Sequence, residues 1–187
     1  MWEDGYIERH ATSFTEDDLK NLYTKDSTPE VLTLQLYAVC STAFAARSAE
    51  PNKLTKGDVK ICFDKDGNKF YELAYLRSKQ QGKRSSREGK DGKLSVFITG
   101  EVEVKIVDRY LDAHPEMQSS TEKLWKYLKT DGRKKYAVAT MGNIGLNALK
   151  EFGKRIAVLL QLPEPNLYTG QCWRGTSCTI MANRGWF

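Results

Sequence analysis

The stretch from Glu30 to Ala46, EVLTLQLYAVCSTAFAA, constrains the fold most because it is apolar on nearly every side of a helix. A helix without a polar face must be surrounded by other elements, so this run predicts a buried central helix. Thr28 and Pro29 precede it and predict an N-cap followed by a proline in the first turn. No uninterrupted apolar run reaches the roughly 18 residues of a membrane-spanning helix, so we expect no membrane partner.

The length of 187 residues, with 40% hydrophobic and 28% charged residues, is typical of one globular domain. We expect residues 1–13 to form an N-terminal tail and residues 14–187 to form this domain. The start, MWEDGYIERH, lacks the basic and then apolar order of a signal peptide. The four cysteines form no CxxC pair, which predicts reduced thiols in an intracellular protein and no metal site.

Short patterned segments predict how the rest of the domain is arranged around the central helix. Thr15 followed by Asp18 is a variant of the capping box and predicts a helix over 15–24. The fold that the segments predict is α+β and mainly helical, with helices packed around a small three-stranded antiparallel sheet. The strands are expected over 59–64, 69–77 and 93–98, and the further helices over 102–114, 119–130, 143–162 and 173–183. A polar connection over 130–138 is expected to lead to a short extended piece.

The positive charge of the chain is concentrated between the second and third predicted strands. From Arg77 to Lys93 there are seven basic residues against two acidic ones, and this excess of five equals the net charge of +5 of the whole chain. A basic loop of this kind favours a polyanion partner, with nucleic acid as the first candidate. A solvated loop that binds nothing is the alternative on composition alone. The candidate DNA contacts are Arg77, Lys83, Arg84, Arg87 and Lys90.

Arg174 lies within a dense apolar set near the end of the chain, one residue after Trp173. A buried guanidinium needs an anion or another acceptor, so we expect Arg174 to face one. Gln171 lies one helical turn before it, Arg47 ends the apolar central helix, and Lys79 lies where the second strand enters the basic loop. Two arginines that converge near a lysine would suit a phosphate. A structural ion pair is the alternative for each arginine taken alone.

The order of three motifs, RSAE at 47–50, RSK at 77–79 and QCWR at 171–174, resembles the catalytic domain of the tyrosine recombinases, which have the phage-integrase fold. The stretches FTEDDLKNLY, LPEPNLYTG and LYTGQCWRGTSCTIMANRG look most like the eukaryotic branch of that family. That branch contains the Crypton-type transposon recombinases and their domesticated relatives. The resemblance covers the chain from about Phe14 onward and rests on the combination of motifs, because each is short.

The resemblance implies a role for each motif residue in DNA strand cleavage and rejoining through a 3′-phosphotyrosyl link. Arg47 and Arg174 would hold the non-bridging oxygens of a DNA phosphate, and Lys79 would protonate the leaving 5′ oxygen or simply add positive charge there. Glu50 would orient Arg47. The implied partner is double-stranded DNA, on which such a protein could form a homo-oligomer, and the implied location is the nucleus. Neither a metal nor a small-molecule cofactor is expected, because the protein supplies the cations.

Two features depart from the family pattern. Gln171 stands where the family most often has histidine, and an amide cannot transfer a proton near neutral pH. The family's nucleophilic tyrosine should follow the second arginine, but no tyrosine occurs after Arg174, and Tyr168 is expected to be a packing residue. We therefore expect a DNA-binding domain that does not cleave DNA as given. A fragment of an active recombinase, truncated at the C-terminus, and a domesticated protein-interaction module without DNA binding are the alternatives.

Overall fold

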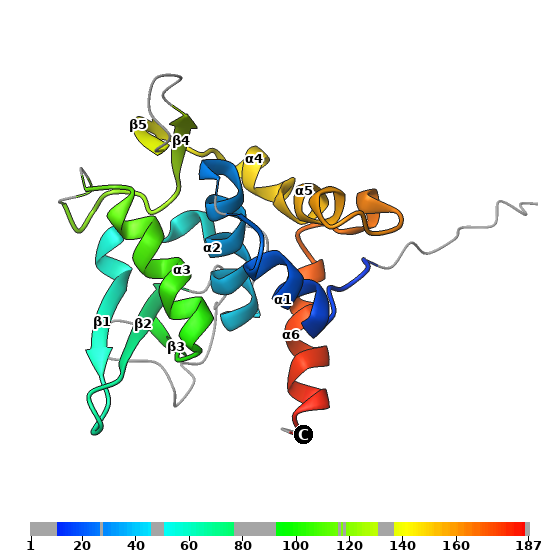
Figure 1. Cartoon of the computed structure of the whole chain (residues 1–187), viewed down its shortest axis with the longest axis horizontal. Helices are drawn as coiled ribbons and strands as arrows, with labels where there is room; N and C mark the ends of the chain where they lie inside the picture. The colour runs from blue at the N-terminus through cyan, green and yellow to red at the C-terminus, as the bar shows by residue number, and fades with distance from the viewer. Residues whose placement is uncertain are drawn as a thin grey trace, which may run out of the picture.

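The computed structural model describes residues 11–26, 28–45, 51–76, 93–115, 117, 119–130 and 137–185. The described part contains six α-helices, three short 3-10 helices, a three-stranded sheet and a two-stranded sheet (Figure 1). The predicted α+β, mainly helical fold with a small three-stranded antiparallel sheet is confirmed. The helices are α1 Glu16–Tyr23, α2 Pro29–Ala43, α3 Glu101–Asp112, α4 Leu146–Lys150, α5 Phe152–Leu159 and α6 Cys172–Asn183.

The first two helices begin where their capping residues predict. Thr15 accepts a hydrogen bond from the backbone N–H of Asp18, and the Asp18 carboxylate accepts one from the backbone N–H of Thr15, which completes a capping box for α1. Thr28 accepts from the backbone N–H of Val31, and Pro29 lies in the first turn of α2. Local sequence signals therefore fix the start of both helices.

Helix α2 is the centre of the domain, as its apolar sequence predicts. All its residues from Val31 to Ser41 are buried, and it contacts α1, α3, α5, α6, β3 and β4. The Tyr37 ring lies at its middle, with ring centroids 5.0 Å from Phe152 and 5.6 Å from Trp173. The helix ends at Ala43, three residues before the predicted end, and Ala45 adopts a left-handed conformation with φ of 48°.

The three-stranded sheet has the order β1-β2-β3, with β1 Val59–Phe63, β2 Lys69–Leu76 and β3 Lys93–Ile98. Both strand pairs are antiparallel. Helix α3 lies along this sheet (Figure 1). Asp108 on α3 joins it to β2, because it pairs with the Lys69 ammonium at 2.5 Å and accepts a hydrogen bond from the Tyr71 hydroxyl.

The helix predicted over 119–130 is wrong. This segment forms turns and then strand β4 Lys126–Thr130, which pairs antiparallel with β5 Ala137–Asn143. Leu124, Trp125 and Lys126 are all buried, and three successive buried positions do not fit one face of a short helix. The backbone N–H of Leu124 also donates to the Leu54 carbonyl at 3.0 Å, so long-range pairing overrides the local helical pattern.

The single helix predicted over 143–162 is two helices, α4 and α5, which meet at Glu151. The C-terminal helix predicted over 173–183 is confirmed as α6. Between α5 and α6, Gln161 and Glu164 have φ values of 56° and 47°, so the chain turns sharply before the short 3-10 helix Pro165–Leu167. No helix in the described ranges is both long and apolar enough to cross a bilayer.

Candidate nucleic-acid interface

Helix α6 presents one buried face and one exposed face, and the two candidate residues that the structure describes are on the exposed one. Cys172 and Trp173 are 0% exposed, whereas Gln171 and Arg174 are exposed. Arg174 is therefore not buried with its apolar sequence neighbours. Successive helical residues point about 100° apart, so a side chain next to a fully buried tryptophan can face solvent. Gln171 lies at the N-cap of α6, one turn from Arg174, so both face the same side.

The buried face of α6 is fixed by contacts with α2 and the N-terminal segment. The Ser177 hydroxyl donates to the Thr42 carbonyl at 2.6 Å, and the Thr176 hydroxyl accepts from the backbone N–H of Phe14 at 2.9 Å. The Trp173 ring lies 5.1 Å from the Phe14 ring, measured between centroids. These contacts set the direction in which Arg174 leaves the surface.

A close approach between α5 and the segment before α6 fixes the start of α6. Gly153 is buried in α5, and a Cβ atom there would lie only 2.5 Å from the Tyr168 carbonyl oxygen and 3.3 Å from the Cys172 sulfur. Glycine is therefore required at this position for packing. The contact determines where α6 begins and so where Gln171 lies.

Three of the predicted site residues lie outside the described residues. Arg47 and Glu50 follow the end of α2, and Lys79 follows the end of β2; the candidate DNA contacts Arg77, Lys83, Arg84, Arg87 and Lys90 also lie outside. The hydrogen bond from Ser177 to the Thr42 carbonyl brings the end of α2 against α6, one turn after Arg174. The end of α2 therefore lies next to α6, which carries Arg174, and the convergence of Arg47 and Arg174 on one phosphate stays a prediction.

Two lysines near Gln171 were not among the sequence candidates. Lys150 and Lys154, both exposed, line an open hollow of about 410 Å³ together with Thr169, Gly170 and Gln171. Glu151 also lines this hollow and offsets part of the positive charge. The four-residue spacing of the lysines could have indicated a shared face. Only the fold shows that this face adjoins the start of α6.

Tyr168 is a packing residue, as its sequence context predicts. Its side chain is buried, and its ring centroid lies 4.6 Å from that of Phe14. Burial raises the pKa of the Tyr168 hydroxyl, so this group stays protonated at neutral pH. A protonated, buried phenol is poorly suited to attack a phosphate.

The described cysteines and acidic residues do not form an evident reaction centre. Cys40 and Cys172 are buried, and burial raises the pKa of the Cys172 thiol to about 12, so it is not a nucleophile at neutral pH. Cys178, by contrast, is exposed. Within the described ranges, no group of three His, Cys, Asp or Glu side chains could hold a metal ion. The chemistry that this surface offers is therefore the binding of anions by Arg174, Gln171 and the two lysines.

Comparison with solved structures shows a tyrosine recombinase catalytic-domain-like fold. The chain is similar to the XerH site-specific recombinase bound to its difH substrate in a pre-cleavage complex, with a TM-score of 0.59 and 12% sequence identity over 95% of this chain. It is also similar to XerH in a post-cleavage complex with palindromic difH, with a TM-score of 0.57 and 11% identity over 94% of this chain. It spans only 44% and 43% of those two recombinase chains. No family model matches the chain, and no curated protein matches it.

Proposed function

We propose that the chain is a double-stranded-DNA-binding domain with a recombinase-like fold that holds the DNA backbone at the start of α6. The observation that carries this proposal is the exposure of Gln171 and Arg174, one turn apart at the start of α6, in a fold similar to that of a recombinase solved with its DNA substrate. A guanidinium on the surface can bind a phosphate through two parallel N–H groups.

Several charges near this face support binding to a polyanion. Lys150 and Lys154 lie beside Gln171, and the end of α2, which precedes Arg47 in the sequence, lies against α6. Residues 77–93 hold as much excess positive charge as the whole chain. Contacts of this kind are directed at the backbone, so they predict binding that depends strongly on salt and weakly on sequence.

The resemblance to tyrosine recombinases supplies the finer part of the proposal. Arg47 and Arg174 would hold the phosphate oxygens, Glu50 would orient Arg47, and Lys79 would lie near the leaving oxygen. The Gln171 amide would donate a hydrogen bond without transferring a proton. We also propose, on the sequence motifs, that the chain is of the Crypton type, that it acts in the nucleus and that it can form homo-oligomers on DNA.

The binding proposal can be tested by fluorescence anisotropy with a labelled duplex over a range of salt concentrations. We expect Arg174→Glu, and separately the combined change Lys83→Glu, Arg84→Glu and Arg87→Glu, to weaken binding at least tenfold at low salt. Lys25→Glu is a matched control, because it makes the same change in charge far from the proposed interface. Lys25 is exposed near the start of α2, and the length of α2 separates this start by about 22 Å from the end of α2 that lies next to α6. Circular dichroism would verify that each variant is folded.

Three results would count against the proposal. Unchanged affinity in Arg174→Glu would remove the start of α6 from the interface. If the wild-type protein binds no duplex even at low salt, the chain is not a DNA-binding domain and a protein-interaction module becomes the better account. A loss of affinity in Lys25→Glu as large as in Arg174→Glu would mean that only net charge matters.

We further propose that these 187 residues bind DNA without forming a covalent link, because no tyrosine occurs after Arg174 and Tyr168 is buried. Incubation with a duplex followed by a denaturing gel should show no protein–DNA band. A covalent band that disappears in Tyr168→Phe would contradict this part of the proposal. It would leave the binding part intact.

A further inference from the structure

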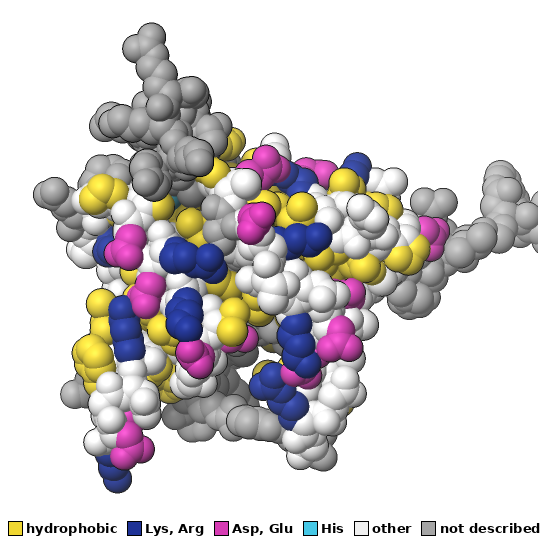
Figure 2. Space-filling view, in the orientation of Figure 1, with side chains coloured by type: hydrophobic (Ala, Val, Ile, Leu, Met, Phe, Trp, Pro, Cys, Tyr) yellow, Lys and Arg dark blue, Asp and Glu magenta, His cyan; other side chains and the backbone are white. Residues whose placement is uncertain are grey.

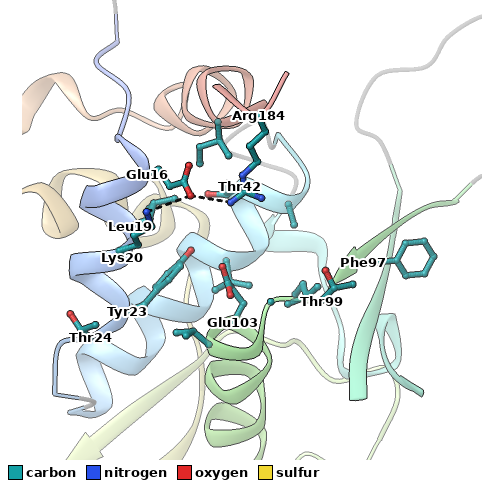
Figure 3. Close-up of a pocket in the computed structure, with 16 residues that line it drawn as sticks. Glu16, Leu19, Lys20, Tyr23, Thr24, Thr42, Phe97, Thr99, Glu103 and Arg184 are labelled. Atoms are coloured by element: carbon teal, nitrogen blue, oxygen red, sulfur yellow. Dashed lines mark hydrogen bonds and ion pairs between the residues drawn. The ribbon is translucent and has the colours of Figure 1, made fainter. Parts of the chain in front are cut away.

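Strand β1 is an outer strand of the three-stranded sheet. Among the described strands it pairs only with β2. It lies at the left margin of the molecule in Figure 1, and hydrophobic side chains lie along that margin in Figure 2. The other outer strand, β3, contacts α2, and the stretch from Phe97 to Thr99 borders a hollow of about 550 Å³ that residues of α1, α2, α3 and α6 also line (Figure 3). The edge of β1 is therefore the more open of the two.

The hydrogen bonds of the β1–β2 hairpin show which backbone groups of β1 face this open edge. The backbone N–H of Asp64 donates to the Asn68 carbonyl at 3.0 Å, so these two residues form a hydrogen-bonded pair at the turn. Hydrogen-bonded pairs alternate along an antiparallel ladder, so the backbone groups of Cys62 also face β2. Those of Ile61 and Phe63 face outward. An outer strand of this kind can pair with a further strand through such groups.

The side chains along β1 alternate between an apolar face and a charged face. Ile61 and Phe63 lie on one face of the sheet and are 55% and 65% exposed. Lys60, Cys62 and Asp64 lie on the opposite face by the alternation of the strand. Lys60 and Asp64 are both exposed, carry opposite charges and lie at equal distances in sequence on either side of Cys62. A partner strand that fits must therefore offer apolar groups on one face and the reverse order of charges on the other.

We propose that β1 pairs antiparallel with β1 of a second copy of this chain, about a two-fold axis that passes between the two Cys62 residues. In this register Ile61 lies opposite Phe63 of the second copy, and the outward backbone N–H and C=O groups of both residues are paired. On the other face Lys60 lies opposite Asp64 of the second copy. The axis repeats each contact, so the edge is complementary to itself in backbone hydrogen bonds, apolar contacts and charge.

The neighbouring registers toward the start of β1 lack this complementarity. An axis at Ile61 would place Asp58 opposite Asp64 of the second copy, and like charges directly opposite each other are destabilising. That register would also need the Val59 N–H, which already donates to the preceding turn. An axis at Lys60 would place the two Lys60 ammonium groups opposite each other. The charged residues therefore select the register in which Cys62 faces Cys62.

The size of this interface predicts a weak dimer. One pair of short strands with two exposed apolar side chains from each copy falls below the roughly 1,200 Å² of a standard interface, so we expect a dissociation constant above about 1 μM. The contact goes beyond the proposed function, because it joins two copies in the absence of DNA. It also uses a part of the molecule other than α6, which leaves Gln171 and Arg174 accessible (Figure 1).

Cys62 makes the register directly testable by crosslinking. In the proposed dimer the two Cys62 residues form a non-hydrogen-bonded pair with Cα atoms about 4.5 Å apart, within the range that a disulfide spans. Brief oxidation of the purified protein with copper phenanthroline should give a dimer on a non-reducing gel, and Cys62→Ser should abolish it. Cys178 is the matched control, because it is more exposed than Cys62 and would dominate random collisions. No dimer, or a dimer that Cys178→Ser reduces as much as Cys62→Ser does, would overturn the proposal.

Sedimentation of the protein without DNA tests the charge pairs independently. Lys60→Glu sets two carboxylates opposite each other at both ends of the contact and should weaken the dimer roughly tenfold, whereas Lys25→Glu should not. Asp64→Asn keeps an oxygen for the turn, where the Asp64 carboxylate accepts from two backbone N–H groups. It should weaken the wild-type dimer but strengthen that of Lys60→Glu, because it removes an attraction in the first and a repulsion in the second.

The sign of the Asp64→Asn effect decides the outcome. The same sign in the wild-type and Lys60→Glu backgrounds would contradict the pairing of Lys60 with Asp64 of the second copy. A wild-type protein that is monomeric at about 1 mM would refute the dimer itself. Neither measurement uses DNA, so failure here is separate from failure of the proposed function.

Discussion

Gly153 provides a sharp test of how α6 is positioned, because its replacement by alanine has two opposing effects. Alanine is favoured over glycine inside a helix by about 1 kcal/mol, and this term alone would stabilise α5. The added methyl group, however, would lie 2.5 Å from the Tyr168 carbonyl oxygen and 3.3 Å from the Cys172 sulfur. Forcing extra atoms into a packed interior costs roughly 1–3 kcal/mol. The contact is with backbone, which cannot rotate away, so we expect the packing cost to exceed the helical gain.

Gly175 in α6 is the matched control for this change. There the added Cβ would meet the Ser13 hydroxyl oxygen, which can rotate away, and would lie 3.3 Å from the Ser13 Cβ, a much milder contact than the one at Gly153. The same change from glycine to alanine should therefore leave the free energy of unfolding unchanged or raise it by up to about 1 kcal/mol. The two substitutions have identical chemistry and differ only in what the methyl group contacts.

An added Cβ only 2.5 Å from a backbone oxygen belongs at the upper end of that cost, roughly 2–3 kcal/mol. After the helical gain of about 1 kcal/mol, we expect Gly153→Ala to lower the free energy of unfolding by roughly 1–2 kcal/mol, which corresponds to a fall of roughly 2–8 °C in the thermal midpoint for a chain of this size. Urea unfolding followed by far-ultraviolet circular dichroism would measure the difference. A Gly153→Ala variant as stable as the wild-type protein would show that α5 and the segment before α6 are not in close contact. In that case α6 would not begin where the structure places it, and Gln171 would lie elsewhere.

Three further changes test other contacts. Asp108→Asn should destabilise the protein, because the Asp108 carboxylate is stabilised by its partners. Burial acts to raise the pKa of Asp108, but the hydrogen bonds from Lys69 and Tyr71 outweigh burial, so the pKa is lowered overall. A lowered pKa means that the carboxylate stabilises the fold above the unfolded-state pKa of about 3.9, so the deficit measured by urea unfolding should shrink as pH falls from 6 to 3; a deficit independent of pH would contradict this. Thr28→Ala should cost about 1 kcal/mol in the same assay through loss of the α2 N-cap, and Thr28→Ser should restore most of it. Ser177→Ala removes the hydrogen bond to the Thr42 carbonyl and should also cost about 1 kcal/mol, whereas no loss would mean that this bond does not hold α6 to α2.

Local signals predicted some elements well because their physics is local. The capping box at Thr15, the Thr28-Pro29 start and the apolar run of α2 each act within a few residues, and all three are found in the structure. The two hairpin strands β1 and β2 follow from a turn sequence between runs of strand formers. Strand β4 was missed because its formation depends on pairing with β5 and on the contact of Leu124 with Leu54, both distant in sequence.

The candidate site shows the same division. The sequence predicted that Gln171 and Arg174 share a face, since residues three apart in a helix do so. Arg174 is exposed although its sequence neighbours are apolar, because that apolar set includes Cys178 and Met181, which the fold also leaves exposed. Lys150 and Lys154 could not be assigned to the site from sequence, because only the contact of α5 with the segment before α6 brings them near Gln171.

The central claim is that Arg174 contacts a DNA phosphate, and the salt dependence of binding by Arg174→Ala measures this most directly. Each phosphate contact contributes about 0.9 to the slope of log affinity against log salt concentration. We predict that Arg174→Ala lowers the magnitude of this slope by about one contact and weakens binding similarly for unrelated duplex sequences. An unchanged slope with unchanged affinity, in a variant shown to be folded, would contradict the account.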